Sequence, residues 1–196
     1  MNVNKRHLVS MLCVLLGACV TGYALVTPGS TMVGDLQVRT GPGWNQVPAA
    51  AIPWARNGTV AWTMNGMSLD RLVIITGVPD GESIYFGRQA TDYPVFRAHM
   101  SEPELCALLA ETIQQAQGTN RTTVKTGGIR PHRFGRAEGM VFDIDADVLD
   151  GPAYRGVAGA FVAGGKLYLL YFLAAVPYYF DQQIAAAESV IESASL

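Results

Sequence analysis

The sequence predicts an α+β domain in which an antiparallel β-sheet packs against two main helices. Most of the chain after residue 34 consists of short runs rich in β-branched and aromatic residues, separated by turn signals. Only two stretches, one in the middle and one at the C-terminal end, carry apolar residues at helical spacing. Strands and helices do not alternate, which argues against a parallel α/β sheet. We therefore expect residues 34–196 to form a single domain.

Strand patterns dominate the first half of this domain. Residues 34–39 alternate apolar and polar side chains, and Asn57-Gly58 is a hairpin-turn signal with a return strand expected after it. Residues 69–78 form the first strongly buried strand, because they are rich in β-branched residues. The expected strands are residues 34–39, 44–47, 59–64 and 69–78, with 82–86 as a candidate to pair back after the turn at 79–81.

A helix is predicted over residues 101–117. Ser101 can cap its start, Pro103 fits the first turn, and Glu104 completes a capping box with Ser101. Gly118 is expected to end the helix. Its apolar stripe consists of Leu105, Leu108, Leu109, Thr112 and Ile113.

The remaining sequence predicts four strands and a closing helix. Residues 138–148 alternate clearly, with Met140 and Phe142 on one face and Asp143 on the other. Gly164-Gly165 is a two-residue hairpin signal, and the run that follows it is nearly all apolar, as in a central strand. The expected elements are strands 121–126, 138–148, 155–163 and 166–174, an edge piece at 129–134 containing Pro131, and a helix over 177–193.

The N-terminus has the order of an export signal. Lys5 and Arg6 precede an apolar run over residues 8–16, and Leu16-Gly17-Ala18-Cys19 follows. These four residues resemble the lipobox of bacterial lipoproteins. The resemblance implies cleavage before Cys19 and attachment of lipid to its sulfur. We thus expect a signal peptide at 1–18 and a lipid anchor with a tether at 19–33.

Two alternatives to the lipoprotein remain open. Residues 8–26 carry no charge and are nearly long enough for an uncleaved membrane helix, although Gly17 and Gly22 interrupt the run. Free secretion is the other alternative. All three place the domain outside the cytosol. For a lipoprotein, Val20 stands where an Asp tends to retain enterobacterial lipoproteins in the inner membrane, so the resemblance favours the outer membrane, facing the periplasm.

The net charge and the cysteine content limit which partners and which bonds we expect for the domain. The chain has a formal charge of −2, and loss of Lys5 and Arg6 with the signal makes it −4. Such a domain has no electrostatic reason to bind nucleic acid. After processing, Cys106 is the one cysteine besides the lipidated Cys19, so no intramolecular disulfide is expected. We expect Cys106 to be buried and inert.

The order of elements resembles the Mog1/PsbP-like group. The resemblance is carried by the strand over 138–147, the hairpin through Gly164-Gly165, the apolar strand 167–174, the final helix and Trp44 near the start of the domain. It implies an antiparallel sheet with helices and a role in docking other proteins. It supplies no catalytic residues.

Two charged clusters are candidate sites. Arg130, Arg133 and Arg136 form a positive patch that could meet lipid phosphate, peptidoglycan acids or an acidic partner, unless they only decorate an edge. Asp143, Asp145 and Asp147 are a weak candidate for a cation, because three acids share one strand face. An EF-hand would need Gly and an acid where Val148 and Tyr154 stand.

Three functions stay open at this point. The first is an envelope lipoprotein with a non-catalytic domain that docks a protein partner. The second is a lipoprotein that binds lipid or a small apolar ligand, and the third is an envelope hydrolase. No Gly-x-Ser-x-Gly nucleophile elbow and no set of metal ligands at a known spacing occurs in the sequence, so we predict neither catalytic residues nor a cofactor.

Overall fold

A computed structural model describes residues 22–86 and 93–196 of the chain. The expected signal peptide, the lipobox and Cys19 therefore lie outside the described residues. The elements are β1 (Ala24–Leu25), β2 (Gly29–Val33), β3 (Leu36–Thr40), β4 (Asn45–Gln46), the short 3-10 helix η1 (Ala49–Ala51), β5 (Thr59–Thr63), β6 (Asp70–Pro79), α2 (Glu102–Gln117), β7 (Thr122–Phe134), β8 (Ala137–Val148), β9 (Ala153–Ala163), β10 (Lys166–Ala175) and α3 (Tyr178–Glu192).

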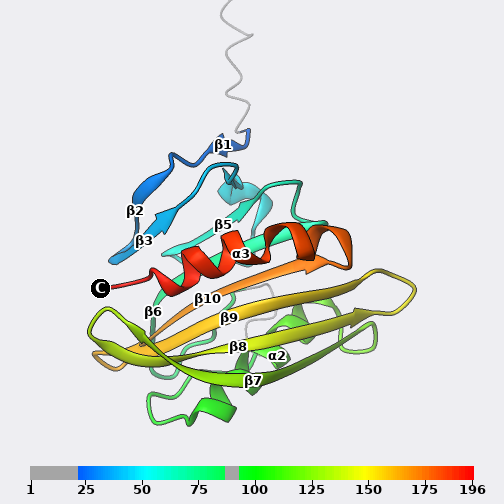
Figure 1. The fold of residues 1–196 in the computed structure, drawn as a ribbon. Coiled ribbons are helices and arrows are strands. Elements are labelled where there is room, and N and C mark those ends of the chain that lie inside the picture. Colours follow the sequence, from blue (N-terminus) through cyan, green and yellow to red (C-terminus); the bar gives the residue numbers. More distant parts are fainter. Residues whose placement is uncertain (1–21, 87–92) are drawn as a thin grey trace, which may run out of the picture.

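An eight-stranded antiparallel sheet forms the middle of three layers (Figure 1). Its strands lie in the order β1-β4-β5-β6-β10-β9-β8-β7, so β1 and β7 are the two edges. Helix α2 packs on one face, where Leu109 and Phe142 belong to one hydrophobic cluster. Helix α3 and the β2–β3 hairpin cover the other face, where Ile191, Leu36 and Phe172 share a second cluster. This architecture confirms the predicted α+β class.

The domain begins earlier than the sequence suggests. Residues 24–25 pair with β4, the buried Val26 donates its backbone N–H to the Trp44 carbonyl at 2.8 Å, and β2 pairs along its whole length with β3. The expected tether over 19–33 is thus too long at its C-terminal end. Thr27-Pro28-Gly29 has the composition of a linker, but the backbone hydrogen bonds of the following residues are satisfied by β3.

Both predicted helices are confirmed. Ser101 caps the start of α2, and its backbone N–H and hydroxyl both donate to Glu104 Oε2 at 2.7 Å, while Gly118 follows the helix at φ 94°. In α3 the buried residues include Ala187, Val190 and Ile191. No helix in the described parts of the chain is long and apolar enough to cross a membrane.

The strands after α2 agree with the sequence pattern in all but one place. Residues 121–126 and 129–134, expected as two pieces, form the single edge strand β7, whose pairing with β8 shifts between Gly127 and Arg130. The β9–β10 hairpin turns at Gly164 and Gly165, whose φ angles of 57° and 75° suit a two-residue turn.

Residues 82–86 differ from expectation. They do not pair back on β6; instead Ser83 bridges Val95 and Tyr85 bridges Ala55. The reason lies in Arg56, whose buried guanidinium donates to the Ser83 carbonyl at 2.7 Å and pairs with Glu82. These contacts hold the segment beside residues 54–56 instead of along the sheet.

Candidate functional site

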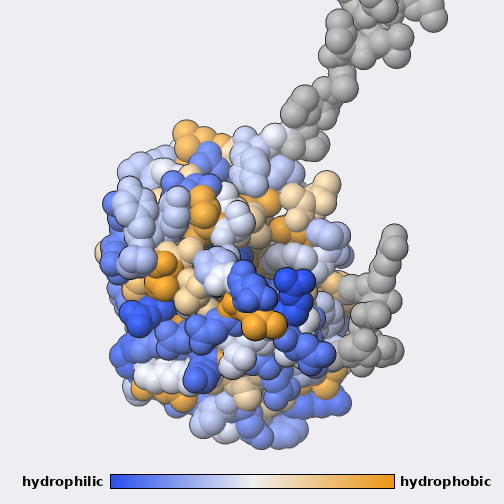
Figure 2. All heavy atoms as spheres, turned by 90° about the vertical axis from the view of Figure 1, so that its right-hand side faces the viewer, coloured by the Kyte–Doolittle hydropathy of each residue, from blue (hydrophilic) through white to orange (hydrophobic). Residues whose placement is uncertain are grey.

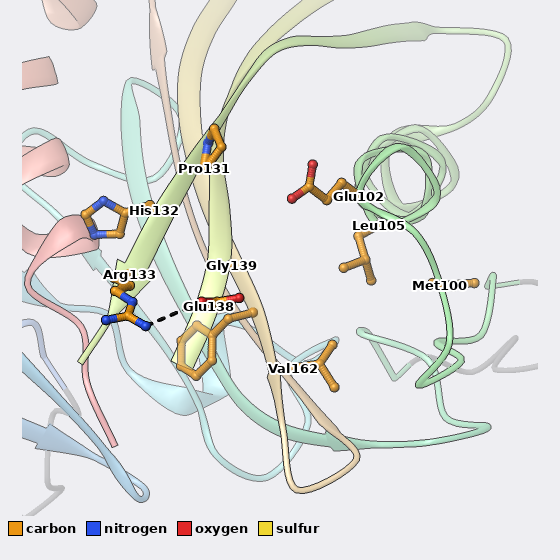
Figure 3. A pocket seen from close by; sticks show the side chains of 10 residues that line it. Met100, Glu102, Leu105, Pro131, His132, Arg133, Glu138, Gly139 and Val162 are labelled. Atoms are coloured by element: carbon orange, nitrogen blue, oxygen red, sulfur yellow. Dashed lines mark hydrogen bonds and ion pairs between the residues drawn. The ribbon is translucent and has the colours of Figure 1, made fainter. Parts of the chain in front are cut away.

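An open groove of about 570 Å³ lies between the start of α2 and the ends of β7, β8 and β9 (Figure 3). The helix side contributes Glu102 and Leu105, with Met100 just before the helix. The sheet side contributes residues that stand across the β7–β8 ladder and on β9. They include Pro131, Arg133, Glu138 and Val162.

The groove is apolar at its base and charged at its rim. Leu105 is buried, and Met100 and Val162 are half-buried. Arg133 Nη2 lies 3.4 Å from Glu138 Oε1, and these two side chains are 72% and 83% exposed. Such an exposed pair contributes little to folding, and neither residue is committed to the core. The arrangement suits contact with an apolar side chain that is flanked by polar groups.

The predicted arginine patch does not form one surface. Arg133 lies at the groove, Arg136 is exposed in the turn between β7 and β8, and Arg130 points to the face that carries α3. Arg130 donates to Asp143 Oδ1 at 2.8 Å and to the Gly128 carbonyl at 2.7 Å. The hydrogen bond with Asp143 raises the pKa of Arg130, and Glu188 and Glu192 of α3 add to this effect.

The three aspartates share one face of β8 as predicted, but two of them are paired with arginine. Asp143 binds Arg130, and Asp145 Oδ1 lies 3.4 Å from Arg155 Nε. Asp147 is exposed further along the strand. Within residues 22–86 and 93–196, no group of three His, Cys, Asp or Glu side chains is arranged to hold a metal ion. Arg130 and Arg155 therefore reduce the repulsion between the carboxylates, and with it the tendency of this strand face to bind a cation.

Sequence reasoning missed a second, smaller cavity of about 200 Å³. Tyr85 and Tyr171 line it and share a hydrogen bond between their hydroxyls, while Trp54 packs against Tyr85 with ring centroids 4.2 Å apart. Burial raises the pKa of both tyrosines, and the neighbouring Tyr171 adds to the rise at Tyr85. The residues that line this cavity come from segments far apart in the chain, so no local sequence pattern could predict it.

Cys106 of α2 is expected to resist thiol reagents in the native protein. Its side chain is buried, and burial raises its pKa to about 11. Because the thiolate is the reactive form, maleimide labelling at pH 8 should be much slower than for an exposed cysteine and should become fast in urea. Mass spectrometry of labelled protein measures this. Equal labelling rates in native and unfolded protein would contradict the burial.

No protein-family model matches the chain, and no curated protein matches it either. Among solved structures, the chain is similar to cyanobacterial PsbP (CyanoP) from Synechocystis sp. PCC 6803, with a TM-score of 0.59 and 14% identity over 93% of this chain and 99% of that one. Two further structures match with lower scores. They are LpqN of Mycobacterium tuberculosis, which is involved in cell envelope biogenesis (TM-score 0.42, 11% identity, 89% and 90% covered), and a variant of the protein Mog1 (0.44, 7%, 88% and 87%).

The likeness to cyanobacterial PsbP defines the fold. The match extends over nearly the whole of both chains. The chain therefore has the PsbP-like α+β fold that the order of its elements predicted. At 14% identity the likeness defines the fold and leaves the function to be argued from the residues.

Proposed function

We propose that this chain is a lipid-anchored protein of the bacterial cell envelope whose domain docks a protein partner in the groove between α2 and strands β7–β9. The groove carries the proposal. It combines a half-buried apolar base with exposed charged side chains, and it is open along its rim. Such a surface receives a side chain or a short segment of another protein.

The position of the first strand, β1, favours a lipid anchor over an uncleaved membrane-spanning helix. If residues 8–26 formed a spanning helix, residues 24–25 could not pair with β4 as strand β1 does. The stretch left for a helix is 8–23, which is sixteen residues. At 1.5 Å per residue it would reach about 24 Å, short of the ~30 Å hydrocarbon core. A cleaved signal followed by lipid on Cys19 needs no such length.

Replacing Cys19 with alanine is expected to abolish lipid labelling. The sulfur of Cys19 is the proposed attachment point, and without it the precursor should remain uncleaved and migrate more slowly. Metabolic labelling with a fatty-acid analogue and gel mobility measure both effects. Cys106→Ala is the matched control, because it removes a buried thiol and leaves the lipobox intact. Undiminished labelling of Cys19→Ala would contradict the lipoprotein assignment.

Two features weigh against the alternatives. The cavity lined by Tyr85 and Tyr171, about 200 Å³, is smaller than the ~300–1,000 Å³ of typical ligand sites. The larger groove has an exposed rim that would leave a lipid partly in water.

A hydrolase needs an activated nucleophile or base near neutral pH. The raised pKa values of Tyr85 and Tyr171 make these hydroxyls harder to ionise, since they hold their protons more tightly.

Crosslinking in intact cells tests the docking groove. A photoreactive amino acid at Glu138, on the groove rim, is expected to capture one discrete protein. The same residue at Glu111, which is exposed on α2 outside the set of groove-lining residues, is the control. Charge reversal of Arg133 to Glu should weaken capture from position 138, because it changes the rim without touching the core. Equal capture from both positions, or none from position 138, would argue against the groove as the docking site.

A further inference from the structure

The first part of the domain is poor in charged residues. Residues 20–34 and 40–55 contain no Asp, Glu, Lys or Arg, although at the chain average of 15% about five would be expected in 31 residues. Of the elements in these segments, β1 and β4 are neighbours at one edge of the eight-stranded sheet, η1 follows β4, and β2 belongs to the separate β2–β3 hairpin (Figure 1). The edge formed by β1 and β4, with η1 after it, thus has no charged residue of its own and is termed the charge-free edge.

This charge-free edge exposes apolar side chains. Tyr23 is 55% exposed and Leu25 is 71% exposed, and Leu25 belongs to β1, the last strand on this side of the sheet. Ala50 of η1 and Pro53 are exposed as well. In Figure 2 the upper end of the visible face is largely pale or orange, and the strongest hydrophilic colouring lies in the lower half. Exposed apolar residues that gather on one surface mark a site of contact with protein or membrane.

The short stretch of chain between Cys19 and β1 limits how far the charge-free edge can lie from the membrane. Only five Cα-to-Cα steps separate Cys19 from Ala24, the first residue of β1, so the chain between them spans at most about 18 Å. A domain of this size has a radius of gyration of about 16 Å, hence a diameter near 40 Å. With acyl chains on Cys19, the domain cannot stand away from the bilayer by more than about half its own width.

We infer that the charge-free edge around β1 rests on the lipid bilayer, with Tyr23 and Leu25 in the headgroup region. The inference rests on the proposed lipidation of Cys19. Tyrosine suits this depth because its ring is apolar and its hydroxyl is polar. The seven inter-strand steps of about 4.8 Å place β7 about 34 Å from β1, so the groove faces away from the membrane.

Lipid-quenched fluorescence tests this orientation. Leu25→Cys and Lys125→Cys are made separately in a Cys106→Ala background and labelled with the same environment-sensitive dye. Lys125 is exposed on β7, the opposite edge, and is the matched control. The processed protein, with its acylation verified by intact mass, is reconstituted into phosphatidylcholine–phosphatidylethanolamine vesicles that carry quenchers on the acyl chains. We expect a blue shift and strong quenching at position 25 and neither effect at position 125.

The other outcomes overturn the inference in different ways. Acylated protein without quenching at position 25 refutes the membrane contact but leaves lipid anchoring intact. Equal quenching at both positions shows that no face is held against the bilayer. A blue shift without quenching shows that a second copy of the chain, and not lipid, covers the edge. Absence of the acyl mass refutes both the anchor and the orientation.

Discussion

Replacing Asp70 with alanine is expected to lower the free energy of unfolding by about 3 kcal/mol. Asp70 is fully buried at the start of β6, and its carboxylate accepts hydrogen bonds from the backbone N–H groups of Met64 at 2.6 Å and Asn65 at 2.8 Å. It also accepts from the Thr63 hydroxyl at 2.9 Å and the Gln183 amide of α3 at 3.4 Å. One side chain thus ties the β5–β6 turn to α3, and its loss leaves several donors without an acceptor.

Urea unfolding followed by tryptophan fluorescence measures the effect, because Trp44 and Trp62 are buried. Asp147→Ala is the matched control, since Asp147 is exposed on β8, and its stability should stay within about 0.5 kcal/mol of the parent. The stability of Asp70→Asn should lie between those of Asp70→Ala and Asp147→Ala, because one carboxylate oxygen is replaced by an NH₂ group that faces other donors. A loss below about 1 kcal/mol for Asp70→Ala would mean that the turn and α3 hold their places without the carboxylate.

Replacing Gly156 with alanine is expected to destabilise the sheet by about 3 kcal/mol or more. Gly156 lies buried in β9, paired with Leu173 of β10 on one side and Ile144 of β8 on the other. A Cβ at this position would collide with the carbonyl oxygen of Phe172 and lie 2.8 Å from its carbonyl carbon. Because the obstacle is backbone of a central strand, no side-chain rotation can relieve the clash.

Gly127→Ala is the control for this prediction. Gly127 lies in the edge strand β7 and does not adopt a positive φ, and no heavy atom lies within 4 Å of the place that an added methyl group would take. Its change in stability should stay within about 0.5 kcal/mol. The urea midpoints of the two variants give the comparison directly. Similar midpoints for both would show that β9 and β10 can separate locally at little cost.

The sequence predicted the elements whose signals are local. The capping box joins Ser101 and Glu104, which are three residues apart, and the Gly164-Gly165 turn depends on the φ angles of two residues. Both could therefore be predicted from a short stretch of sequence. The strands β1 and β2 were missed because their hydrogen-bond partners, β4 and β3, follow them in the chain and their own side chains give little alternation. Residues 82–86 were misplaced because Arg56, an earlier residue, decides where they lie.

The candidate site was less accessible to sequence reasoning. Arg130 and Arg133 are three residues apart in one strand, so they point to opposite faces, and the sequence alone did not establish that residues 122–134 form one strand. The groove needs Glu102 from a helix start, Glu138 from β8 and Val162 from β9. Only the packing of α2 on the sheet brings these three together, because no two of them are neighbours in the chain.

By itself the sequence determined the fold class, the boundaries of both helices and the hairpin of the central strands, since propensity, capping and periodicity act within a few residues. Tertiary structure alone decided which arginines pair with which acids, where the groove opens and that the uncharged strands β1 and β4 lie together at one edge. The physical reason is that these features depend on pairing between residues tens of positions apart, and that pairing follows from burial of the two hydrophobic faces of one sheet.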